Sequence, residues 1–222
     1  MHPTLRKAHE GVATPRHPLA ARCSRALLLI ALALVATGGT CSDPTPSKLL
    51  LDANYDPGDP SDAFDGTSEA SPAVAQTFTV LQEGRLEQFE VLLTQGTSAD
   101  TGTIYVEIRS TDATGAPELD PNTALVSIEV DTATLPATLV EEFTLFDISD
   151  LASIQVQPGE IYAIVVEFDS RGTNTDGLPI ALVLGMAGDP YIDGDGYTGE
   201  SNVAFMDSVK DYIFATWVRV KG

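Results

Sequence analysis

The segment from Pro158 to Ser170 constrains the fold more than any other part of the sequence. It opens with a Pro-Gly pair, turn chemistry that commonly precedes a strand. Its apolar side chains then fall alternately on two faces: Tyr162, Ile164, Val166 and Phe168 on one, and Ile161, Ala163 and Val165 on the other. A strand that is apolar on both faces belongs in the interior of a sheet. We therefore expect the other strands to be arranged around this one.

The rest of the chain predicts more short strands, separated by turn residues and without a long amphipathic helix. Including the segment above, we expect about ten strands, the others at 49–51, 74–80, 86–93, 103–109, 124–130, 139–148, 151–157, 180–186, 202–205 and 212–220. The alternation is clearest at 103–109, where Ile104, Val106 and Ile108 form one face. This spacing predicts an all-β fold, an antiparallel β-sandwich of the jelly-roll type.

The N-terminal region has the pattern of an export signal. An apolar run from Ala26 to Ala36 follows Arg22 and Arg25, and it is too short to span a bilayer. Small residues then lead to Cys41, which indicates a bacterial lipoprotein whose Cys41 is lipidated and becomes the new N-terminus. The alternative is ordinary secretion, with cleavage near the Ala36-Thr37-Gly38 sequence. We expect a signal peptide at 1–40, a tether at 41–48 and the sandwich at 49–221, in an extracytoplasmic protein.

Charge and composition exclude several function classes. The formal net charge is −20, and residues 1–41 hold five of the twelve basic residues but one of the thirty-two acidic ones. The remainder therefore carries seven basic and thirty-one acidic residues, a net charge of −24 that repels nucleic acid. All three histidines and both cysteines also lie within residues 1–41. The predicted domain therefore lacks the residues for Ser-His-Asp or Cys-His catalysis, for ordinary zinc sites and for internal disulfides.

Two acidic stretches suggest a cation site, because Ca²⁺ prefers carboxylate and backbone oxygens. The later stretch matches an EF-hand loop at several positions, and its candidate ligands are Asp189, Asp193, Asp195 and Glu200. The other stretch runs from Asp52 to Asp65, and the two stretches would share a site if they meet at one end of the sandwich. The alternative is that both are solvated turns or loops without bound metal.

Two aromatic residues are candidate ligand-binding residues. Trp217, the only tryptophan, and Tyr105 are both expected to point outward from their strands. Exposed aromatic rings stack on sugar rings, although packing beneath a loop is the alternative. Glycoside hydrolysis needs two carboxylates at a set separation, and no spacing selects a pair among Glu141, Glu142, Asp147 and Glu167. We therefore expect no catalytic site.

A series of short motifs resembles the jelly-roll modules called choice-of-anchor domains, found on secreted bacterial proteins. The motifs are Gln76-Thr77-Phe78, Leu86-x-x-Phe89-x-Val91, Ile104-x-Val106-x-Ile108-Arg109, Pro117, Leu125-Val126, Pro158-Gly159-x-x-Tyr162-Ala163-Ile164, Tyr191 and Phe214-Ala215-Thr216-x-Val218. The resemblance implies a secreted or surface β-sandwich without an established enzymatic role. Such domains often carry a C-terminal anchor, and since this sequence stops at Gly222 we expect the anchor at Cys41.

These observations favour a non-catalytic surface or adhesion module, attached to the membrane through its N-terminal lipid. The alternative is a carbohydrate-binding module, with or without calcium. The sequence does not identify the protein or glycan partner.

Overall fold

The computed structural model describes residues 46–56, 63–67, 73–137, 142–168, 178–188, 191–200, 203–208 and 210–222. All of these residues belong to Ser42–Gly222, one of the two units into which the chain divides. The predicted signal peptide and Cys41 lie outside the described residues. Within the described ranges, no helix has the length and apolar character that crossing a membrane requires.

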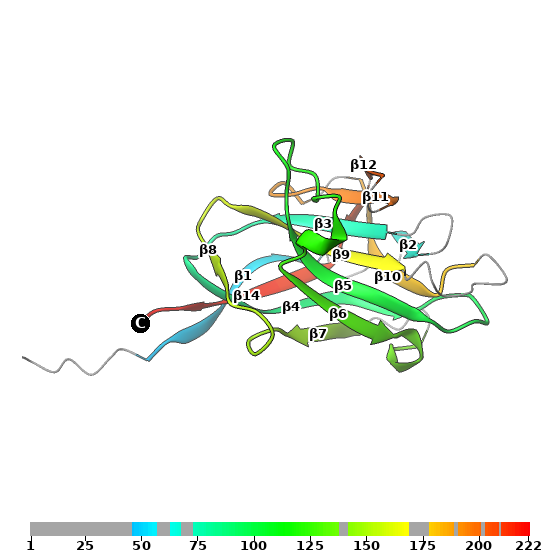
Figure 1. Cartoon of the computed structure of the whole chain (residues 1–222), viewed down its shortest axis with the longest axis horizontal. Coiled ribbons are helices and arrows are strands. Elements are labelled where there is room, and N and C mark those ends of the chain that lie inside the picture. Colours follow the sequence, from blue (N-terminus) through cyan, green and yellow to red (C-terminus); the bar gives the residue numbers. More distant parts are fainter. Residues whose placement is uncertain are drawn as a thin grey trace, which may run out of the picture. The chain divides into compact units, whose positions relative to one another are not determined.

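Two antiparallel sheets pack against each other and confirm the predicted all-β sandwich (Figure 1). The eight-stranded sheet has the order β1 (Lys48–Tyr55), β14 (Phe214–Val220), β4 (Gly84–Gln95), β10 (Ala181–Ala187) and β13 (Lys210–Tyr212). Off this path, one strand pairs with β10 and two with β4: β2 (Ala63–Thr67), then β7 (Phe143–Asp147) and β8 (Ile154–Val156).

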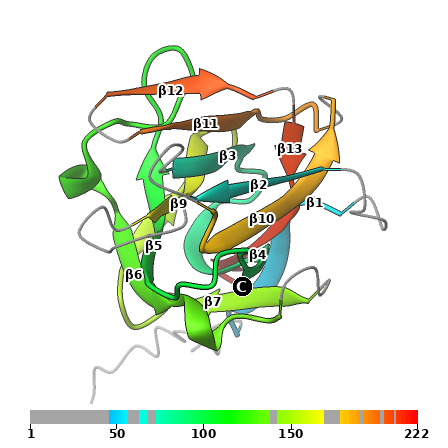
Figure 2. The ribbon, with the colours of Figure 1, turned by 90° about the vertical axis from the view of Figure 1, so that its right-hand side faces the viewer.

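The six-stranded sheet has the order β12 (Ala204–Asp207), β11 (Gly196–Glu200), β3 (Ala73–Thr79), β9 (Ile161–Phe168), β5 (Thr103–Ser110) and β6 (Val126–Asp131). Figure 2 shows β12, β11 and β3 side by side. Two short 3-10 helices, η1 (Pro121–Thr123) and η2 (Thr132–Thr134), precede and follow β6.

Strand β9 has the interior position that its two apolar faces predict, because it pairs with β3 on one side and β5 on the other. Ile164 and Val166 belong to the main core between the sheets. Ala163 and Val165 belong to a second apolar cluster on the opposite face, against which Ala116 packs. Ala116, in the connection from β5 to β6, and Phe205 of β12 therefore cover part of this outer face. The side chain of Phe168 is not among those described.

Aromatic residues join the two sheets across the main core. Phe78 of β3 and Phe214 of β14 are fully buried, with ring centroids 5.9 Å apart. Phe214 also meets Tyr191 edge to face at 5.2 Å. Burying large aromatic side chains at such contacts is a main source of stability in a sandwich.

The described residues contain fourteen strands, more than the ten or so that the sequence predicts. The expectation of one turn over Asp189–Glu200 needs correction: among the described residues of this stretch, Tyr191–Asp195 has irregular structure, whereas the residues after it form a strand. Gly196–Glu200 is strand β11, which pairs with β3 and β12. Its backbone hydrogen bonds in the sheet outweigh the turn preference of its two glycines.

Candidate functional site

A row of side chains with Trp217 near its centre crosses the outer face of the eight-stranded sheet. Phe214, Thr216 and Val218 are buried, so Trp217 points to the opposite, outer face as predicted, where it is half-buried. The register places Trp217 opposite Leu51 of β1 and Gln88 of β4.

The same row continues from Gln88 to Asp147 of β7. Gln88 Nε2 donates a hydrogen bond of 3.0 Å to Asp147 Oδ2. Hydrogen bonds from Ser149 and Gln88 lower the pKa of Asp147 to about 2, so its carboxylate is ionised at neutral pH. Trp217 therefore lies beside an ordered amide–carboxylate pair.

A second row lies one step along the strands and carries two arginines. Arg219 of β14 is opposite Arg85 of β4, and Arg85 is opposite Gln155 of β8. The β14–β4 register shifts between Trp217 and Val218, and this irregularity leaves Glu87 without a direct partner on β14. Glu87 fills the space between the two guanidinium groups.

Glu87 holds both arginines in place from beneath. Its side chain is 3% exposed. Arg85 Nε donates a hydrogen bond of 2.9 Å to Glu87 Oε1, and Arg219 Nε donates one of 2.6 Å to Glu87 Oε2. Arg85 Nη2 also donates to Oε1. Burial raises the pKa of Glu87, but these hydrogen bonds and the two positive charges outweigh it and lower the pKa overall. The carboxylate therefore stays ionised and restricts both side chains.

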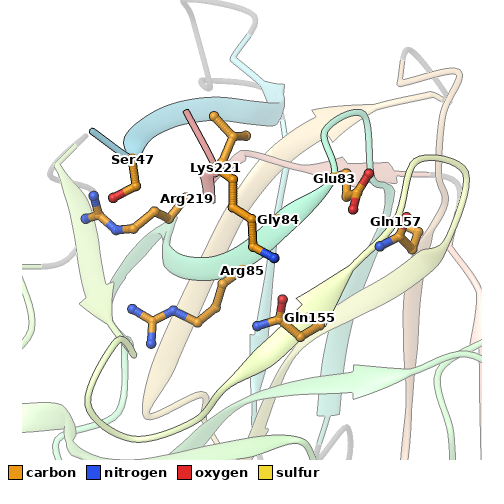
Figure 3. A pocket seen from close by; sticks show the side chains of 9 residues that line it. Ser47, Glu83, Gly84, Arg85, Gln155, Gln157, Arg219 and Lys221 are labelled. Atoms are coloured by element: carbon orange, nitrogen blue, oxygen red, sulfur yellow. The ribbon is translucent and has the colours of Figure 1, made fainter. Parts of the chain in front are cut away.

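A hollow of about 400 Å³ lies beside these arginines (Figure 3). Its polar lining comes from β4, β8 and β14 and from the residues next to them: Glu83, Arg85, Gln155, Gln157, Arg219 and Lys221. Ser47, just before β1, also lines it. The hollow therefore presents guanidinium, ammonium and amide donors, one step along the sheet from Trp217. Such donors bind oxyanions.

The structure does not bring the second aromatic candidate to this face. Tyr105 lies on β5 of the six-stranded sheet, opposite Glu129 of β6 and Glu167 of β9. It is half-buried on the outer face of that sheet. Because Trp217 lies on the outer face of the other sheet, the two aromatic residues cannot contribute to one site.

The carboxylates considered for hydrolysis also lie apart. Asp147 is on the eight-stranded sheet, whereas Glu167 is on the six-stranded sheet. Glu167 accepts a 2.5 Å hydrogen bond from Arg109 Nη2, while Arg109 Nε donates 2.7 Å to Glu107. Arg109 is fully buried in this cluster, which gives Glu167 a structural role. Glu142 is exposed, and Glu141 lies outside the described residues.

The calcium candidates are described only in part. Asp189 and the side chain of Glu200 lie outside the described residues, whereas Asp193 and Asp195 are exposed next to β3. The carbonyl of Asp193 accepts a 2.7 Å hydrogen bond from Thr79 Oγ1. Within the described residues, no group of three or more His, Cys, Asp or Glu side chains is arranged to hold a metal. The calcium site stays a prediction.

The two acidic stretches do approach each other near Tyr191. Burial raises the pKa of Tyr191 to about 12, and the negative charges of Asp193, Asp52 and Asp211 contribute. Asp52 is 5% exposed; its Oδ1 accepts the N–H groups of Leu81 at 3.0 Å and Gln82 at 2.7 Å. Its Oδ2 has no hydrogen-bond partner in the described part of the chain. Burial raises the pKa of Asp52, although the two backbone hydrogen bonds oppose the effect.

The sequence analysis missed the hollow. A signal was present, because Arg85, Arg219 and Lys221 are three of only seven basic residues after Cys41. What the sequence lacks is the register that aligns β4 with β14. A scan against protein-family models finds no match, and a search of curated proteins finds no significantly similar sequence.

Proposed function

We propose that this protein is a non-catalytic binding module of the bacterial surface, attached to the membrane by a lipid on Cys41. Its binding face is the outer face of the eight-stranded sheet around Trp217. The observation that carries the proposal is a half-buried tryptophan on a sheet face, beside a polar hollow. The resemblance to choice-of-anchor domains and the predicted signal peptide support a surface location.

Trp217 suits a binding role because of its surroundings. Its neighbours across the strands are Leu51, which is 50% exposed, and Gln88, which is hydrogen-bonded to Asp147. A partly solvent-exposed aromatic ring supplies a large contact area at a small cost in conformational entropy.

A carbohydrate is the second candidate class of ligand, and the Trp217 row favours it. A sugar ring presents an apolar face, which stacks on an aromatic ring, and hydroxyl groups at its edge, which exchange hydrogen bonds with amides and carboxylates. Gln88 and Asp147 provide such groups next to the ring. A protein adhesin partner would use the same face through Trp217 and Leu51.

Binding is tested with a glycan array and a pull-down of surface proteins, comparing wild type with Trp217→Ala. Tyr105→Ala is the matched control, because it removes a half-buried aromatic from the outer face of the other sheet. We expect Trp217→Ala to abolish any interaction without changing the circular dichroism spectrum, and Tyr105→Ala to retain it. Equal losses in both variants would contradict the assignment of the binding face.

The anchor is tested separately by cell fractionation. Cys41→Ala should move the protein from the membrane fraction to the soluble fraction, because lipidation requires the Cys41 thiol. A wild-type protein that is already soluble would show that the signal directs ordinary secretion. That result would remove the anchor from the proposal but leave the binding face untouched.

A further inference from the structure

The basic residues of the domain are concentrated at the hollow. Seven basic and thirty-one acidic residues follow Cys41, and three of the seven line this one hollow. The nearby carboxylates are Glu83, which lines the hollow, Glu87, Asp147, which is within reach of the charge of Arg219, and Glu160, which accepts a hydrogen bond from the backbone N–H of Gln157. Three cations therefore lie together here in a domain of charge −24.

The two arginines have N–H donors that Glu87 does not use. Each guanidinium has five N–H donors, and Glu87 takes two from Arg85 and one from Arg219. The two arginine side chains are 35% and 37% exposed, so their remaining donors are accessible to solvent beside the hollow. Lys221 lines the hollow without a salt bridge to any other described residue.

The arginines are also preorganised. Because Glu87 is buried between them and ionised, it fixes both guanidinium groups before any ligand arrives. Binding then costs less side-chain entropy than it would with two free arginines. Glu87 cancels one of the two arginine charges, which leaves the other guanidinium charge and the Lys221 ammonium group to interact with an anion.

We propose that the hollow binds the carboxylate of an acidic saccharide, a sugar of the uronic acid type, whose ring stacks on Trp217. The inference rests on the proposed binding face and adds the chemical class of ligand. Trp217 and Arg219 are two residues apart on one strand, so their side chains are about 7 Å apart on the same face. A uronic acid carries its carboxylate directly on the ring, which lets one sugar unit reach both groups.

The test uses the full chain and the fluorescence of Trp217, which is the only tryptophan. The probes are oligosaccharides of galacturonic, glucuronic and mannuronic acid, each paired with its methyl ester, which keeps the ring and removes the charge. At physiological salt, screening over about 8 Å reduces repulsion by distant carboxylates. We expect at least one acid form to bind about 10-fold or more tightly than its ester, since charge-assisted hydrogen bonds are the stronger ones.

Lys221→Gln is the principal variant because Lys221 takes no part in the Glu87 ion pairs, so the change should leave the fold intact. We expect it to weaken binding of the acid form about 3–5-fold, the effect of one exposed charge pair, and to leave ester binding unchanged. Lys210→Gln is the matched control, because Lys210 lies on β13 at the far end of the strand order. Its binding should equal that of wild type.

The outcomes separate this inference from the proposed function. Acid and ester forms that bind equally, with Trp217→Ala abolishing both in isothermal titration calorimetry, would overturn the inference and leave the binding face standing. No binding of any of these saccharides would overturn the inference, while a protein partner that depends on Trp217 would still support the face. Binding to phosphatidylglycerol vesicles but to no acidic saccharide would also overturn it, and would assign the cations to lipid headgroups.

Discussion

Glu87→Gln is the substitution that most directly perturbs the arrangement of the two arginines. The change keeps the size of the side chain but replaces one carboxylate oxygen by an NH₂ group. That group faces an N–H donor of either Arg85 or Arg219, so at least one hydrogen bond is lost and the buried counter-charge disappears. The two guanidinium groups then lose the carboxylate that restrains their positions.

The magnitude follows from burial. Removing one partner of a buried ion pair costs about 3–5 kcal/mol, because the remaining charge is left without compensation. Here Glu87 is 3% exposed, but the arginine side chains are 35% and 37% exposed, so water solvates the guanidinium groups that are left. We therefore expect a loss of about 2–3 kcal/mol in the free energy of unfolding at neutral pH.

The pH dependence has a defined sign. The pKa of Glu87 is lowered in the folded protein, so its contribution is present above the unfolded value of 4.5 and is lost as the pH falls through the folded value. Wild type should therefore lose stability in acid more steeply than Glu87→Gln. The free energies of unfolding of the two proteins should become similar at acidic pH. Urea denaturation followed by circular dichroism between neutral and acidic pH measures both quantities.

Glu90→Gln is the control for this prediction. Glu90 lies on the same strand, but burial and then the charge of Asp56 raise its pKa. Its ionised form therefore costs stability at neutral pH, and Glu90→Gln should be neutral or mildly stabilising. If Glu87→Gln has the same free energy of unfolding as wild type at neutral pH and loses stability in acid as steeply as wild type, Glu87 does not hold the arginines as described.

Substitutions at three further positions test other parts of the structure. Asp52→Asn should stabilise the protein at neutral pH, because the raised pKa makes ionised Asp52 unfavourable, and this gain should shrink as the pH falls toward 3.8. Asp52→Ala loses both backbone hydrogen bonds and should lower the free energy of unfolding, measured by urea denaturation, by about 2 kcal/mol. Phe214→Ala should cost about 3–5 kcal/mol, because Phe214 is fully buried between the sheets. Gly84→Ala would place a methyl group 2.4 Å from the backbone oxygen of Arg219, so we expect a cost of about 1–3 kcal/mol and weaker ligand binding; unchanged values would contradict the packing described for the hollow.

The features that the sequence predicts correctly depend on local alternation. The two apolar faces of β9 predict its interior position, which the pairing with β3 and β5 confirms. The alternation along 214–218 predicts that Trp217 faces outward, and the burial of Phe214, Thr216 and Val218 confirms it. Both conclusions use side-chain periodicity within one strand, which a sequence displays directly.

The features that the sequence does not predict depend on pairing between distant segments. Strand β11 has two glycines in five residues, and its strand conformation is set by the edges of β3 and β12. Arg109 lies on the same face of β5 as Tyr105, yet it is fully buried, and its Nη1 donates to the carbonyl of Glu118, which follows β5. The hollow requires Arg85 and Arg219 to be opposite each other, a register that neither strand specifies alone.

The central claim is that Trp217 lies beside a cluster of basic side chains in an otherwise acidic domain, and collisional quenching of its fluorescence tests this directly. Iodide and caesium ions quench tryptophan, and a domain of charge −24 should attract caesium and repel iodide unless cations surround the ring. We predict that iodide quenches Trp217 more efficiently than caesium, and that Lys221→Gln weakens this preference whereas Lys210→Gln does not. Stronger quenching by caesium in the wild-type protein would contradict the claim.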